Sequence, residues 1–212
     1  MDKSLKDIAI VLTAHPKQQK FWAPVLQCLE NYPGPLVLAY DDIDTAMIPQ
    51  EILMRFAVVV VTGFRPGILG HGPGELMCMQ KGFDAAAKLG AEYVLKLGFD
   101  DPPYRWRFLA ELRRILIDGK LDIIDALTCI VFGKTPVLTK LMRQAVLETR
   151  KGSAESYYKF AAGKIGAKRR LCSGVWFEKL LGAIHIHGEY ALNAGHSPAW
   201  TWEIGEKWPR QS

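Results

Sequence analysis

Short apolar runs alternate with longer segments of helical spacing through the first half of the chain. The apolar runs predict strands over residues 7–13, 36–40, 56–62 and 93–97. Apolar positions three and four apart predict helices over 17–31 and from about 75 to 89, the second after a glycine-rich stretch. Strands and helices in this order predict right-handed βαβ units. We therefore expect an α/β fold of the Rossmann type, with a mostly parallel sheet flanked by helices.

The second half of the chain is less regular. We expect helices over 106–116, 136–150 and 154–165, a strand within 121–132, and weak periodicity from residue 171 onward. Charge changes as well, since residues 1–106 hold 10 basic and 12 acidic side chains and residues 107–212 hold 17 basic and 10 acidic ones. A basic second half suits an anionic partner, although surplus surface lysines would give the same balance.

Composition removes several classes of protein. With 49% apolar residues, 9 Phe and 6 Trp among 212 residues, the chain can offset the entropy of ordering, which excludes disorder. Its four cysteines are far apart and form no CxxC pair, so we expect reduced thiols and no disulfide scaffold. We see no secretory signal, and every apolar run is far shorter than the roughly 20 residues of a membrane span. A cytoplasmic protein without a membrane span is the expectation.

Polar side chains follow the predicted strands of the first half. Thr13 and His15 end the first strand, Asp41 the second, and Asp100 and Asp101 the fourth. Ligands of parallel α/β sheets bind where the carboxyl ends of the strands converge, so these side chains should lie together. Adjacent carboxylates repel each other unless a cation neutralises them, and Mg²⁺ or Mn²⁺ would do so while leaving positions for phosphate oxygens. The alternative is that this Asp-Pro sequence simply starts the next helix.

Two stretches carry a resemblance to a known family. Residues 74–86 read Gly-Glu-Leu-Met-Cys-Met-Gln-Lys-Gly-Phe-Asp-Ala-Ala, and residues 90–101 read Gly-Ala-Glu-Tyr-Val-Leu-Lys-Leu-Gly-Phe-Asp-Asp. This pattern resembles the central stretch of GT-A fold glycosyltransferases of the family 2 type. In those enzymes a glycine-containing loop and a helix lead into a strand that ends at an acidic metal motif. The resemblance covers about residues 7–103, half of the chain.

The resemblance implies roles for individual residues. Donor-binding residues would be Thr13, Ala14, His15, Asp41, Gln80 and Asp100, and metal ligands would be Asp100, Asp101 and His187. The family's Asp-x-Asp motif is compressed here to Phe99-Asp100-Asp101, so either acid is a candidate for the principal ligand. Met79-Gln80 stands where the family commonly has Arg-Asn.

Histidines and a late carboxylate complete the predicted site. Many GT-A enzymes bring a late histidine back to the metal, which the resemblance asks of His185, His187 or His196. His185 and His187 would share one face of a strand, and the alternative is a pair of partly exposed strand histidines. If the reaction inverts the anomeric centre, a carboxylate must accept the acceptor proton. Glu178 and Glu189 are the candidates, and Glu189 joins Asp100 and Asp101 in the predicted catalytic set.

Two further groups of residues have a functional and an ordinary interpretation. The basic residues Lys164, Lys168, Arg169 and Arg170 would meet an anionic acceptor or a departing diphosphate, or they would be a solvated helix end. The late tryptophans Trp176, Trp200, Trp202 and Trp208 would stack on sugars, or they would fill the core and an oligomer interface.

We therefore expect a single GT-A-like domain over residues 1–212, with a donor-binding half at 1–103 and an acceptor-side half at 104–212. The predicted activity is a metal-dependent glycosyltransferase of the hexosyltransferase type. It would use Mn²⁺ or Mg²⁺ and move a sugar from a UDP- or GDP-sugar to a glycan, a glycoconjugate or another hydroxyl acceptor. A sugar nucleotidyltransferase and a non-catalytic carbohydrate- or anion-binding module are the alternatives. No nucleic-acid-binding module is recognisable, and a homo-oligomer remains open.

Overall fold

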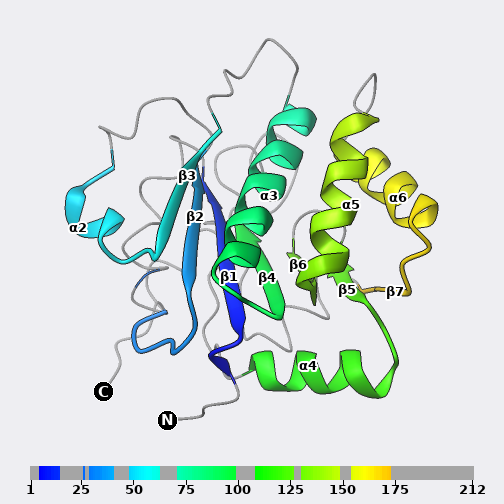
Figure 1. Ribbon diagram of the computed structural model, residues 1–212, viewed down its shortest axis with the longest axis horizontal. Helices are drawn as coiled ribbons and strands as arrows, with labels where there is room; N and C mark the ends of the chain where they lie inside the picture. Colours follow the sequence, from blue (N-terminus) through cyan, green and yellow to red (C-terminus); the bar gives the residue numbers. More distant parts are fainter. Residues whose placement is uncertain are drawn as a thin grey trace, which may run out of the picture.

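The computed structural model describes residues 5–14, 26, 29–40, 48–62, 71–98, 108–126, 130–148 and 154–172. These residues build a seven-stranded sheet with helices on both faces (Figure 1). The strands are β1 (Ile8–Ala14), β2 (Leu36–Tyr40), β3 (Val58–Val61), β4 (Tyr93–Gly98), β5 (Ile123–Ala126), β6 (Ile130–Lys134) and β7 (Arg169–Leu171). The helices are α2 (Gln50–Leu53), α3 (His71–Lys88), α4 (Phe108–Asp118), α5 (Thr135–Leu147) and α6 (Ala154–Lys164).

The sheet is mostly parallel, as the sequence predicts. Its strand order is β3-β2-β1-β4-β6-β5-β7. β1 to β4 run in one direction, and β6 pairs antiparallel with both β4 and β5. β7 pairs parallel with β5, so among the described strands β6 alone runs against the rest. The prediction of an α/β fold with helices flanking the sheet is confirmed.

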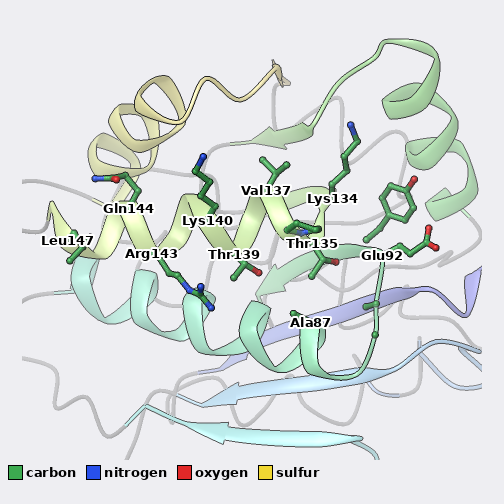
Figure 2. Close-up of a pocket in the computed structure, with 14 residues that line it drawn as sticks. Ala87, Glu92, Lys134, Thr135, Val137, Thr139, Lys140, Arg143, Gln144 and Leu147 are labelled. Carbon is green, nitrogen blue, oxygen red and sulfur yellow. The ribbon is translucent and has the colours of Figure 1, made fainter.

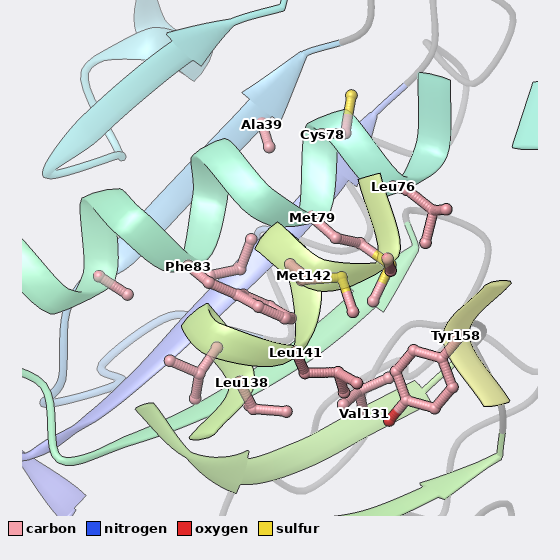
Figure 3. Close-up of a cluster of buried hydrophobic side chains, with 14 of the residues drawn as sticks. Ala39, Leu76, Cys78, Met79, Phe83, Val131, Leu138, Leu141, Met142 and Tyr158 are labelled. Carbon is pink, nitrogen blue, oxygen red and sulfur yellow. The ribbon is translucent and has the colours of Figure 1, made fainter. Parts of the chain in front are cut away.

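Each face of the sheet is covered by a separate apolar layer. On one face α3, α5 and α6 bury a cluster that includes Met79, Phe83, Leu141 and Tyr158 (Figure 3). On the other face the buried leucines of α4 join a second cluster with apolar side chains of β1, β2, β4, β5 and β6. The central strands are therefore apolar on both sides, which explains why their sequences are nearly continuous hydrophobic runs.

Gly82 lets α3 lie unusually close to β1. A Cβ atom on Gly82 would be 2.5 Å from the Cγ1 atom of Val11 and 3.4 Å from the Cβ atom of Ala39. Val11 is fully buried in a central strand, so it has no room to retreat. A side chain at position 82 would therefore push α3 away from the sheet.

We expect Gly82→Ala to destabilise the fold by about 1–3 kcal/mol, the usual cost of overpacking a core. Gly163→Ala is the matched control, because a Cβ atom on this α6 glycine meets nothing within 4 Å. There alanine should stabilise the helix by up to about 1 kcal/mol. Urea denaturation followed by circular dichroism measures both changes. Equal stability of the two variants would contradict the close approach of α3 to β1.

Several elements differ from the sequence prediction. The single strand expected within 121–132 is a pair of antiparallel strands, β5 and β6. α3 begins at His71, so the end of the glycine-rich stretch already forms its first turn. α2 and β7 were not predicted, because four and three residues are too few to show a periodicity. None of the helices that the structure describes combines the length and apolar character needed to cross a membrane.

Candidate functional site at the carboxyl edge of the sheet

The carboxyl ends of four parallel strands meet at one edge of the sheet. Ala14 at the end of β1 is paired with Tyr40 at the end of β2, and Tyr40 with Val61 at the end of β3. On the other side of β1, Thr13 is paired with Gly98, the last residue of β4. The four strands therefore end level with one another (Figure 1).

The strand order reverses beside β1. After β1 the chain continues to β2 and β3 on one side, and it then crosses to β4 on the other side. Such a topological switch point leaves a crevice at the carboxyl ends of the two strands between which the order reverses. Here those strands are β1 and β4, so the crevice begins at Thr13 and Gly98.

Two of the predicted donor-binding residues lie at this switch point. Thr13 is half-buried and donates a hydrogen bond from its hydroxyl to the carbonyl of Leu97, at 3.4 Å. Ala14, the last residue of β1, is buried. The other predicted residues of this edge and of the tail lie outside the described residues, namely His15, Asp41, Asp100, Asp101, Glu178, His185, His187, Glu189 and His196.

Gln80 lies on the part of α3 that covers the carboxyl half of β1. Its neighbour Gly82 packs on Val11, two residues before Thr13 in β1. Lys81 donates hydrogen bonds from Nζ to the carbonyls of Val61 and Thr62, at 3.1 and 3.2 Å. These contacts hold α3 against the middle of β1 and the end of β3. The structure thus brings half-buried Gln80 to the same face and the same end of the sheet as Thr13.

A buried lysine on β4 is a site feature that sequence reasoning missed. The Lys96 side chain is 4% exposed, and its Nζ atom lies 3.2 Å from Oε1 of Glu75 on α3. Lysine is rarely this buried unless it is paired, because a desolvated ammonium is costly. The available signal was the lysine itself, inside the otherwise apolar strand sequence Tyr-Val-Leu-Lys-Leu-Gly.

The described residues contain no group of three or more His, Cys, Asp or Glu side chains that could hold a metal ion. The carboxylate of Glu75 on α3 is already paired with Lys96. The predicted ligands Asp100, Asp101 and His187 all lie outside the described residues, so the metal site stays a prediction.

The basic cluster after α6 has an internal partner. The Arg169 guanidinium donates two hydrogen bonds to the carboxylate of Asp125, which is fully buried on β5. Tyr158 donates to the same carboxylate at 3.2 Å, and the guanidinium lies 5.0 Å from the centre of its ring. Burial, and secondly the charge of Asp125, raise the pKa of Tyr158 well above its ordinary value.

This arrangement corrects the expectation for two of the basic residues. Arg169 lies in β7, which pairs with β5, and the carboxylate of Asp125 on β5 neutralises its charge. Lys164 pairs with Glu148 at 2.7 Å, across the gap between α6 and α5. Neither is a free cation awaiting an anionic acceptor.

Known structures share this fold, although no protein-family model matches the sequence and no curated protein resembles it in sequence. A protein of Desulfovibrio desulfuricans G20, assigned provisionally to the nucleotide-diphospho-sugar transferases, superposes with a TM-score of 0.55 at 10% identity, over 79% of this chain and 80% of that one. This chain shares the fold of that protein.

Two further known structures have a similar fold. A CMP:2-keto-3-deoxy-manno-octonic acid synthetase complexed with CTP superposes with a TM-score of 0.50 at 13% identity, over 82% of this chain and 97% of that one. The glycosyltransferase GlyE of Streptococcus pneumoniae TIGR4 superposes with a TM-score of 0.50 at 12% identity, over 96% of this chain and 65% of that one. At such identities the similarity establishes the fold, so the reaction must be argued from the site.

A groove of about 990 Å³ lies at the opposite edge of the sheet (Figure 2). It runs along α5 beside the end of α3, and Tyr93 at the start of β4 lines it. Two of its cations are neutralised, Arg143 by Asp84 and Lys134 by Asp122, each at 2.9 Å. Because this groove lies at the amino ends of the parallel strands, we place the candidate site at the carboxyl edge.

Proposed function

We propose that the protein is a nucleotide-sugar transferase that moves a hexose from a UDP- or GDP-sugar to a hydroxyl group of a glycan or glycoconjugate. The observation that carries the proposal is the switch point between β1 and β4, where Thr13 and Gly98 end paired strands. Two of the similar structures support it, since one is described as a nucleotide-diphospho-sugar transferase and the other as a glycosyltransferase.

The donor would lie across the ends of β1, β2 and β4. Thr13, Ala14, His15, Asp41 and Gln80 would bind its nucleotide. Asp100 and Asp101, two and three residues after the end of β4, would hold a divalent cation, with His187 returning to it from the tail. Carboxylate oxygens are ligands that Mg²⁺ and Mn²⁺ prefer, and imidazole suits Mn²⁺. When bound, such an ion offsets the charge that develops on the leaving diphosphate, which is worth several kcal/mol in the transition state.

The bond changes are those of a simple displacement. The acceptor oxygen forms a bond to the anomeric carbon, the bond between that carbon and the diphosphate oxygen breaks, and the nucleoside diphosphate leaves with the electron pair. The acceptor hydroxyl loses a proton. In an inverting reaction Glu189, or alternatively Glu178, would accept it. In a retaining reaction the departing diphosphate would accept the proton, so neither glutamate would be required as a base.

A sugar nucleotidyltransferase is the second candidate. The similarity to the CMP:2-keto-3-deoxy-manno-octonic acid synthetase favours it, because this chain covers 97% of that enzyme. Against it stands the sequence Thr-Ala-His-Pro-Lys-Gln over residues 13–18, at the end of β1 and beyond it, which lacks the glycines that commonly bind a nucleoside triphosphate.

The phosphate compound that the protein releases distinguishes sugar transfer from nucleotidyl transfer. The protein is incubated with UDP- and GDP-sugars and mixed glycan acceptors, and separately with nucleoside triphosphates and free sugars, each with Mn²⁺, with Mg²⁺ and with EDTA. Our proposal predicts release of nucleoside diphosphate that stops in EDTA. Release of inorganic pyrophosphate from the triphosphate would identify a nucleotidyltransferase. Turnover of neither, with glycan binding that persists in EDTA, would identify a binding module and overturn the proposal.

A further inference from the structure

We propose that Lys96 is the cation that contacts the terminal phosphate of the donor's nucleoside diphosphate, and that Glu75 is its counter-ion when the donor is absent. This inference rests on the proposed function and adds a residue that the sequence prediction did not contain. It concerns a substrate class, nucleoside diphosphates and their sugar esters, and the ion pair that Lys96 on β4 forms with Glu75 on α3.

The sheet register sets the position of Lys96. Lys96 is paired with Val11 on β1 and with Val131 on β6, so the three side chains point to the same face of the sheet, toward α3. The next position along β4 on this face is Gly98, beside Thr13 at the switch point. Lys96 is therefore the last side chain of β4 on this face before the crevice, about 7 Å from it along the strand.

The ammonium group extends toward that crevice. Gly82 of α3 packs beside Val11, at the level of Lys96. Glu75 precedes Gly82 by seven residues, which is about 10 Å along the helix axis toward the end of α3 that lies at the carboxyl edge. Because Nζ of Lys96 lies 3.2 Å from Oε1 of Glu75, the lysine side chain must point along the sheet toward the strand ends.

Burial and exposure of the pair fit a cation held ready for an anion. Lys96 is 4% exposed, whereas the Glu75 side chain is 33% exposed. The carboxylate can therefore turn to water when a phosphate approaches, while the ammonium stays in place. The helix position where the resembled family has arginine supplies no cation here, because Met79 stands there and is buried in the apolar cluster.

The alternative is that the ion pair between Lys96 and Glu75 is purely structural and holds α3 to β4. The effect of a structural ion pair is lost equally when either partner is replaced, whereas a phosphate contact is lost only when Lys96 is replaced. The preference of the protein for a nucleoside diphosphate over the monophosphate distinguishes the two roles, since the extra phosphate is the group that Lys96 would bind.

The experiment measures the affinities of the wild type and of Lys96→Met, Lys96→Arg and Glu75→Gln for UDP, UMP, GDP and GMP, in Mn²⁺, by calorimetry. Circular dichroism first establishes that each variant folds. We expect Lys96→Met to lose about 10- to 100-fold in diphosphate affinity with little change for the monophosphate. Lys96→Arg should keep most of the preference, and Glu75→Gln should bind the diphosphate as tightly as the wild type or more tightly. If one of the single variants does not fold, the double variant Lys96→Met/Glu75→Leu replaces it. The same loss of the preference for the diphosphate over the monophosphate is expected.

An unchanged diphosphate preference in Lys96→Met, or equal losses in Lys96→Met and Glu75→Gln, would overturn the inference. Either result leaves the proposed function standing, because the wild type still binds the diphosphate. A wild type that binds none of the four nucleotides would instead refute the proposed function itself.

Discussion

Replacing Asp101 by Asn should reduce sugar transfer by about 100-fold or more while the protein still folds. The amide keeps the size of the side chain but removes the negative charge that would hold the divalent cation. Asp100→Asn belongs in the same experiment, because either acid is a candidate for the principal ligand. The readouts are the initial rate of nucleoside diphosphate release at saturating Mn²⁺ and the Mn²⁺ affinity by titration.

Asp118→Asn is the matched control for these two variants. Asp118 ends α4 with an exposed side chain and pairs with Arg114 on the same helix at 3.1 Å. An exposed ion pair of this kind contributes little, so transfer should proceed at the wild-type rate. Full activity in both Asp100→Asn and Asp101→Asn would eliminate the metal role of the acidic pair.

Replacing Asp125 by Ala should lower the free energy of unfolding by about 3–5 kcal/mol, because it leaves the Arg169 guanidinium partly buried without its carboxylate. The hydroxyl of Tyr158, which is fully buried, loses its acceptor at the same time. In a protein of this length the melting temperature should fall by about 6–20 °C. Urea denaturation followed by circular dichroism measures the change.

Asp122→Ala, at the residue that directly precedes β5, is the control. Asp122 pairs with Lys134 at 2.9 Å, but both side chains are partly exposed, so the loss should be about 1 kcal/mol or less. The hydrogen bond from Lys134 lowers the pKa of Asp122, so this stability is present at neutral pH and disappears as pH falls through the lowered value. Equal losses in the Asp125 and Asp122 variants would contradict the buried role of Asp125.

The architecture of the first half was readable from the sequence because three of its four strands, β1, β2 and β4, are buried on both faces. Continuous apolar runs mark such strands, and β2 has the predicted bounds, residues 36–40. The polar residues that follow them predicted a site at one edge, and the register of Thr13 with Gly98 confirms that the edge exists. Whether His15, Asp41, Asp100 and Asp101 converge there is still a prediction.

The second half was harder to predict because its key contacts join residues far apart in the sequence. Arg169 looked like part of a solvated basic cluster, and only the pairing of β7 with β5 brings it to Asp125. The ion pair of Lys96 could not be predicted for the same reason, since its partner Glu75 is 21 residues away on a helix. No local pattern reports such pairings.

Amide hydrogen exchange with and without a UDP- or GDP-sugar and Mn²⁺ tests the location of the site most directly. We predict slower exchange in the peptides that follow β1 and β4, over residues 13–20 and 98–106, where the donor would lie across the switch point. Slower exchange confined to residues 87–93 and 134–147, which line the groove at the opposite edge, would contradict a carboxyl-edge site.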